Sequence, residues 1–165
     1  MICSIDTCFL IDWTRYSRRK LLLKVFDYCY IVDEVLNEIR SENTIVFISE
    51  LLARGFLVFY PFRREIASLV RELVETSIRD PRIRTLDPPE AYALAIGIRE
   101  NAIVLTENRG VLNLVKLYPK YSASVWRSYE LLQELFKRGL IEDIDEEIKR
   151  YEGETRHKFS RIHRR

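Results

Sequence analysis

Acidic side chains are the residues of this chain best suited to chemistry. Both histidines, His157 and His163, lie close to the C-terminal end, so neither a buried histidine base nor a Ser-His-Asp arrangement is expected. The five glycines are not grouped as G-x-x-x-x-G-K or G-x-G-x-x-G, which predicts neither a P-loop nor a dinucleotide-binding turn. We therefore expect no nucleotide cofactor and place the candidate chemistry on carboxylates.

Four of these carboxylates follow predicted strands or lie on the helices after them: Asp6, Glu38, Glu90 and Glu107. In a parallel α/β sheet, ligands bind outside the carboxyl ends of the strands, where these side chains can converge. Converging carboxylates repel unless they are neutralised, and Mg²⁺ or Mn²⁺ with oxygen ligands is the simplest neutralisation. The alternative for each acid taken alone is a helix cap or a solvated surface charge. Asp6, flanked by apolar residues, fits that alternative least.

The elements that must position these acids alternate along the chain. Apolar runs predict strands at 1–5, 29–32, 56–60, 103–105 and 122–125. Amphipathic spacing predicts helices at 14–28, 34–40, 63–77 and 128–138, with a helix or loop-helix at 45–53. The run Asp87-Pro88-Pro89-Glu90 is typical of a helix start, with the helix extending to 98 and another following at 109–117. Alternating strands and helices predict an α/β fold with a mostly parallel sheet.

Composition favours one globular domain with a substantial core. The chain has 165 residues, of which 47% are hydrophobic and 12% aromatic. A net charge of +2 permits a phosphate-rich partner without requiring one. We expect no membrane span and no signal peptide, because no apolar run of about eighteen residues occurs and no basic region precedes the first apolar segment. A soluble, cytoplasmic protein is the expectation.

Two further features refine this picture. The sequence contains an odd number of cysteines without C-x-x-C spacing: Cys3, Cys8 and Cys29. We therefore predict buried free thiols in a reducing cytosol. Beyond Asp143 the chain is strongly charged. We therefore divide it into a domain at 1–141 and a charged C-terminal helix with a mobile basic tail at 142–165, the tail starting at Arg156.

The order and spacing of the acidic motifs resemble the PIN domain family, metal-dependent ribonucleases that include the toxin half of VapBC-type toxin-antitoxin pairs. The motifs are SIDTCFLID with Asp6, VDEVLNEI with Glu38, PEAYALAIG with Glu90, and IVLTENRG. The segment SVWRSYELLQELFKRGLI also resembles the closing strand and helix of a PIN subgroup. The resemblance covers about 1–141 and implies a three-layer α/β/α sandwich around a central, mostly parallel sheet.

The resemblance also implies roles for named residues. The reaction would be metal-dependent hydrolysis of an RNA phosphodiester, with Asp6 as the central ligand of Mg²⁺ or Mn²⁺. Glu90 and Glu107 would be further ligands, direct or through water, and Glu38 a ligand or the group that orients the water. Supporting roles fall to Thr7, which would hydrogen-bond the carboxylates, and to Arg109, which would hold a phosphate. The implied partners are RNA, a second copy in a homodimer and, for a toxin, an antitoxin protein.

The sequence departs from the family pattern at its third and fourth acidic positions, which are commonly aspartate. The third is Glu90, and the fourth motif is Thr106-Glu107-Asn108. Either Glu107 reaches the metal with its longer side chain, or Asn108 stands where an aspartate usually stands. Asp12 and Glu34 are alternative ligands. The second hypothesis is therefore a PIN-like module that has lost catalysis and binds RNA or a protein partner.

Overall fold

A five-stranded parallel sheet forms the centre of the protein. The computed structural model describes residues 1–159, in which the strands lie in the order β3-β2-β1-β4-β5. Cys3 aligns with Cys29 on one side of β1, and Ser4 with Val104 on the other. The strands are β1 Ile2–Ile5, β2 Tyr28–Ile31, β3 Leu57–Phe59, β4 Ile103–Leu105 and β5 Val125–Trp126. All five predicted strands are present, the last displaced from 122–125 to Val125–Trp126.

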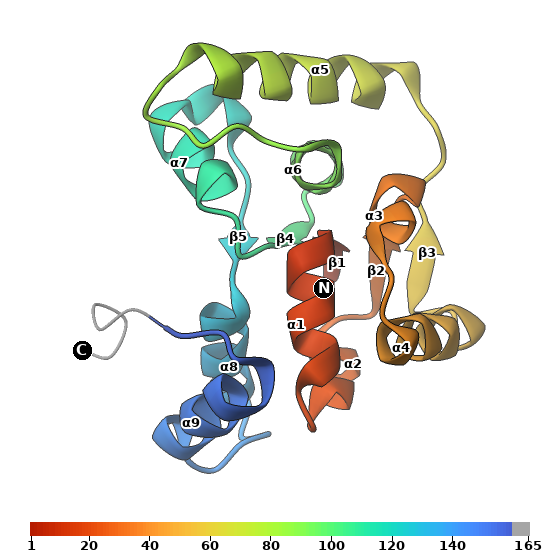
Figure 1. Cartoon of the computed structure of the whole chain (residues 1–165), viewed down its shortest axis with the longest axis vertical. Coiled ribbons are helices and arrows are strands. Elements are labelled where there is room, and N and C mark those ends of the chain that lie inside the picture. The colour runs from red at the N-terminus through yellow and green to blue at the C-terminus, as the bar shows by residue number, and fades with distance from the viewer. Residues whose placement is uncertain (160–165) are drawn as a thin grey trace.

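Helices cover both faces of this sheet, which confirms the predicted three-layer α/β/α fold. Figure 1 shows α5, α6 and α7 on one side of the strands and α1, α2, α4, α8 and α9 on the other. The first group comprises α5 Arg64–Arg79, α6 Pro88–Glu100 and α7 Arg109–Leu117. The second comprises α1 Thr7–Arg15, α2 Leu22–Val25, α4 Glu42–Ala53, α8 Ser128–Lys137 and α9 Ile144–Thr155. Helix α3, Asp33–Glu38, follows β2, and two 3₁₀ turns occur at Arg19–Leu21 and Pro119–Tyr121.

Helix α6 packs unusually close to the two central strands. Ser4 in β1 donates its hydroxyl to the Ala93 carbonyl at 2.7 Å. A Cβ atom at Gly97 would lie 2.2 Å from the side chain of Val104 in β4, so only glycine permits this approach. The contact fixes the start of α6, and with it Glu90, beside the carboxyl ends of β1 and β4.

The predicted helix at 14–28 was wrong. Helix α1 instead occupies Thr7–Arg15, where Asp6 caps it by accepting the Phe9 N–H at 2.8 Å. The helix ends at Arg15, and the next residue, Tyr16, is its C-cap and is completely buried. The chain then continues as the first 3₁₀ turn and the single-turn helix α2. The apolar residues Phe9, Leu10 and Trp13 form the buried face of this capped helix.

The C-terminal helix α9 packs against α1. Glu147 on α9 is buried, accepts the hydroxyl of Tyr16 and pairs with Arg18 at 2.6 Å. Residues 156–159, the part of the predicted mobile tail that the structure describes, lie against the body of the protein, with Phe159 stacked on Tyr151 at 5.6 Å. The remainder of that predicted tail, 160–165, lies outside the described residues. No helix within 1–159 is both long and apolar enough to span a membrane.

Candidate functional site

The carboxyl ends of β1 and β4 form the topological switch point of the sheet. After β1 the chain leads to β2 on one side, whereas after β4 it leads to β5 on the other. Ligands of open α/β sheets bind in the crevice that such a reversal creates. Asp6 directly follows β1, and the run Thr106-Glu107-Asn108 directly follows β4.

Asp6 is a completely buried carboxylate at this point, with 0% of its surface exposed. One oxygen accepts the Phe9 N–H, and the other accepts the hydroxyl of Thr106. Within residues 1–159 no basic side chain pairs with it. Burial, with a smaller contribution from the charges of Glu90 and Glu107, raises the pKa of Asp6 to about 7 against the lowering effect of its hydrogen bonds.

Glu90 is the second buried acid of the site. It is the third residue of α6, and its Oε2 accepts the Asp87 N–H at 2.8 Å in a capping box. Its Oε1 accepts the side-chain amide of Asn108. Burial raises the pKa of Glu90, while the hydrogen bonds from Asp87 and Asn108 counteract the shift. The predicted helix start at 87–90 is confirmed, and it brings a carboxylate to the end of β4.

The loop after β4 connects these two acids. Thr106 donates to Asp6 and accepts the Asn108 N–H at 3.0 Å. Asn108 donates to Glu90 and accepts the Gly110 N–H at 2.6 Å, which caps α7. A continuous hydrogen-bonded chain therefore runs from Asp6 through Thr106 and Asn108 to Glu90.

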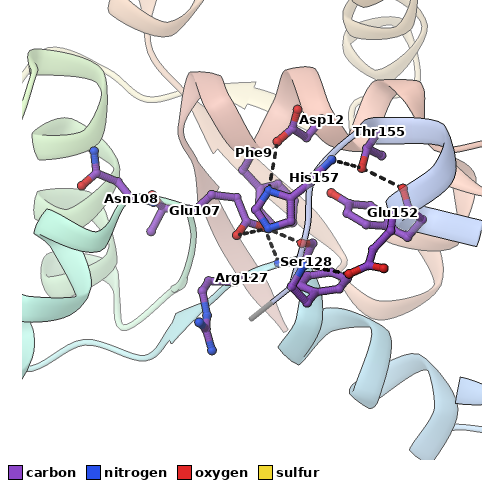
Figure 2. Close-up of polar contacts among 12 residues, drawn as sticks. Phe9, Asp12, Glu107, Asn108, Arg127, Ser128, Glu152, Thr155 and His157 are labelled. Atoms are coloured by element: carbon purple, nitrogen blue, oxygen red, sulfur yellow. Dashed lines mark hydrogen bonds and ion pairs between the residues drawn. The ribbon is translucent and has the colours of Figure 1, made fainter. Parts of the chain in front are cut away.

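Glu107 points to a different set of partners. Its Oε1 accepts both the N–H of Ser128, at 2.8 Å, and the Ser128 hydroxyl. Its Oε2 lies 3.4 Å from Nε2 of His157. Figure 2 shows Glu107 directed at Ser128 and His157, while Asn108 lies on the other side of the loop. Of the two candidates for the fourth position, Asn108 is thus the one in contact with Glu90.

Glu38 lies farther out, at the exposed end of α3, and has neither a hydrogen bond nor an ion pair to any described residue. Its position is nevertheless related to the site through Cys8, in the first turn of α1. The pKa of Cys8 is raised to about 11, first by partial burial and then by the charges of Asp6, Glu90, Asp12 and Glu38. The charges of these four acids therefore all act on the first turn of α1. Cys8 itself is exposed, contrary to the prediction of three buried thiols, whereas Cys3 and Cys29 are buried.

The two alternative ligands lie at the periphery. Asp12 is 3.4 Å from Arg15 and 3.6 Å from Nδ1 of His157. Glu34 lies beside Tyr92, whose pKa is raised by burial and then by the Glu34 charge. Neither shares a hydrogen bond with Asp6 or Glu90 among the described residues.

Two supporting residues have unused polar groups. The hydroxyl of Thr7 is buried without a hydrogen-bond partner in the part of the chain that the structure describes. Arg109, the first residue of α7, is exposed and has no ion pair with a described residue. Such groups are available to water or to a phosphate oxygen.

Residues 1–159 contain no cluster of three His, Cys, Asp or Glu side chains arranged to hold a metal, so a Mg²⁺ or Mn²⁺ ion here would have only the pair of buried acids as carboxylate ligands from these residues. Mg²⁺ commonly binds through one or two carboxylates and keeps several waters or substrate phosphates as its other ligands. Asp6 and Glu90 supply two such carboxylates, each oxygen of which retains acceptor capacity beside its hydrogen bond. The unsatisfied hydroxyl of Thr7, adjacent to Asp6, suits a metal-bound water.

Three residues of this region were not predicted from the sequence: Thr106 as the partner of Asp6, and Ser128 and His157 as the partners of Glu107. Thr106 carried a signal, since a hydroxyl directly after a buried strand stands at the binding edge of a parallel sheet. His157 carried none, because only the fold of α9 returns it to β4.

The chain was compared with protein families, curated proteins and solved structures. No protein-family profile matches the sequence, and no curated protein is similar to it. Among solved structures, the chain is similar to one in the complex FitAB bound to an IR36 DNA fragment, with 14% identity and a TM-score of 0.51 over 77% of this chain and 94% of the other. It is also similar to FitAcB from Neisseria gonorrhoeae, with 15% identity and a TM-score of 0.45 over 76% and 96%. At these identities the first likeness supports the predicted PIN-like α/β/α architecture.

Proposed function

We propose that this protein is a metal-dependent endoribonuclease of the PIN type that hydrolyses RNA phosphodiester bonds. The observation that carries the proposal is Asp6, a fully buried carboxylate at the switch point with no basic partner within residues 1–159. A buried charge of this kind is costly unless a cation compensates it. Glu90, joined to Asp6 through Thr106 and Asn108, provides the second carboxylate.

In this proposal Asp6 and Glu90 would hold Mg²⁺ or Mn²⁺, and the bound ion would supply a water of lowered pKa and charge stabilisation at the phosphate. The Thr7 hydroxyl hydrogen-bonds that water or a phosphate oxygen. Arg109, exposed at the start of α7, binds a phosphate of the RNA. Glu38, at the end of α3, would orient the attacking water. Glu107 would become a ligand of the metal ion only after its side chain leaves Ser128.

The test is a comparison of wild type with Asp6→Asn and Glu90→Gln in Mn²⁺ calorimetry and in cleavage of a mixed-sequence RNA. We expect Mn²⁺ binding and cleavage in the wild type, and loss of both in Asp6→Asn. Asp145→Asn, an exposed acid on α9, is the matched control and should behave as wild type. Full cleavage by Asp6→Asn would refute the proposal.

One observation favours the second candidate, a PIN-like module without catalysis. The hydrogen-bonded chain contains two of the four predicted acids, Asp6 and Glu90. Glu107 instead contacts Ser128 and His157. Under this alternative the wild type would bind RNA or a protein without turnover, and Mn²⁺ would not bind at micromolar concentration.

We also propose the partners that a toxin of this type would have, an antitoxin protein and a second copy of the chain. The FitAB complex, to which the fold is similar, is bound to DNA. Co-expression with a small protein encoded next to this one, followed by size-exclusion chromatography with light scattering, tests both: a complex indicates an antitoxin, and twice the monomer mass of the isolated chain indicates a homodimer.

A further inference from the structure

The segment after α9 turns back across the exit of β4. Arg156, at the end of α9, has a φ of 63°, and this left-handed residue reverses the chain. The next backbone N–H, that of His157, is donated to the Thr155 hydroxyl at 3.1 Å. The N–H of Phe159 is donated to Glu152 at 2.8 Å. Residues 156–159, here called the strap, are therefore held in a defined position beside Glu107 (Figure 2).

Ring packing holds the strap to the body of the protein as well. The ring of Phe159 lies 5.6 Å from that of Tyr151 on α9 and 5.5 Å from that of Tyr129 on α8. The imidazole of His157 lies 5.1 Å from Phe159 in an edge-on arrangement. Since Tyr151 is completely buried, Phe159 extends the aromatic core and fixes the position of His157.

His157 bridges two acids that belong to different elements. Its Nδ1 lies 3.6 Å from Asp12 on α1, and its Nε2 lies 3.4 Å from Oε2 of Glu107 after β4. The backbone N–H and the hydroxyl of Ser128 both donate to the other oxygen of Glu107, Oε1. The two oxygens of Glu107 thus have different partners: Ser128 donates to Oε1, and among residues 1–159 the contact of Oε2 is with His157 of the strap.

Glu107 stands between the two residues that contact the buried acids. Thr106 and Asn108 point toward Asp6 and Glu90, whereas Glu107 points to the opposite side, as alternate residues of an extended chain do. The charge of Glu107 already acts on Asp6. A third carboxylate is therefore next to the site but kept out of it.

We propose that the strap is an autoinhibitory contact: together with Ser128 it holds Glu107 on the side of α1 and α8, and its release weakens this hold so that Glu107 can leave Ser128 and join Asp6 and Glu90 as a third metal ligand. The inference rests on the proposed metal-dependent function. A third carboxylate strengthens the binding of a hard divalent cation, because hard cations prefer anionic oxygen ligands. The strap would thereby regulate the site from within the same chain.

Full-length His157→Ala and Phe159→Ala provide the test, since the first removes the contact and the second loosens the packing beneath it. Lys158→Ala, an exposed residue between them, is the matched control. We expect Mn²⁺ calorimetry to show about tenfold tighter binding in the first two variants and no change in the control. RNA cleavage at limiting Mn²⁺ should increase in parallel.

Adding Glu107→Gln identifies the ligand. In His157→Ala it should remove the gain in Mn²⁺ affinity, because the third carboxylate ligand is then lost. Wild-type affinity in both strap variants, with folding verified by circular dichroism, would overturn the strap inference while leaving the proposed function intact. Equal Mn²⁺ binding by wild type and Asp6→Asn would instead overturn the proposed function.

Discussion

Thr106 donates its hydroxyl to the buried carboxylate of Asp6. This hydrogen bond joins the ends of β1 and β4, the neighbouring strands at the switch point of the sheet. Thr106 also accepts the Asn108 N–H, so one side chain links the acid after β1 to the loop after β4.

Asp6→Asn should stabilise the metal-free protein at neutral pH. The pKa of Asp6 rises from 3.8 to about 7 on folding, so the folded state retains a proton that the unfolded state releases. The stability linked to this group is fully present below about pH 4 and is lost as the pH rises through about 7. A difference of roughly three pH units corresponds to on the order of 4 kcal/mol.

Urea denaturation across this pH range measures the effect. The difference in unfolding free energy between Asp6→Asn and wild type should increase from pH 5 to pH 8 and should shrink when Mn²⁺ is added to the wild type, because the ion replaces the proton. Asp145→Asn should show neither trend. A constant difference at every pH would contradict the raised pKa.

Thr106→Val keeps the shape of the side chain and removes its hydroxyl. It leaves the Asn108 N–H without its acceptor and Asp6 with one donor fewer, so we expect a loss of about 1–3 kcal/mol. Thermal unfolding of this variant, compared with Thr85→Val at an exposed threonine, checks the value. Equal melting temperatures for the two variants would mean that the Thr106 hydroxyl contributes nothing.

Asn108→Asp places a carboxylate directly against Glu90. The two like charges should raise the pKa of Glu90 further and destabilise the metal-free protein by about 1–3 kcal/mol at neutral pH. Because aspartate remains a good helix cap, α7 should be retained. We expect Mn²⁺ to reverse the destabilisation and to bind more tightly than in wild type. Unfolding curves with and without Mn²⁺ decide this, and a Mn²⁺ response equal to that of wild type would argue against a metal beside residue 108.

Arg18→Ala tests the attachment of α9. It leaves Glu147 buried without its closest cation, while the hydroxyl of Tyr16 remains as a donor. Arg18 is about one-third exposed, and so we expect a loss of about 2 kcal/mol, less than for a fully buried pair. Arg150→Ala removes a more distant cation, at 3.8 Å, and should cost less than about 1 kcal/mol. Chemical denaturation of both variants provides the comparison, and the reverse order would refute this account.

The sequence by itself determined the elements that depend on local signals. The apolar run at 103–105 predicted a buried strand, and Asp87-Pro88-Pro89-Glu90 predicted a helix start, because proline is tolerated in a first turn and acidic side chains favour the positive end of a helix. The same reasoning was wrong at 14–28. Asp6 was interpreted as a candidate ligand after a strand, whereas it also caps a helix that begins at Thr7 and ends at Arg15.

Only the tertiary structure decided which acids meet. Asp6 and Glu90 are joined because Gly97 lets α6 approach β4 and because Thr106 and Asn108 point to the same side of the loop. Glu107 is directed away by Ser128 on α8 and by His157 after α9, residues that no local pattern connects to it. Side-chain direction at a strand exit depends on what packs from distant parts of the chain, and that information is absent from the spacing of the residues.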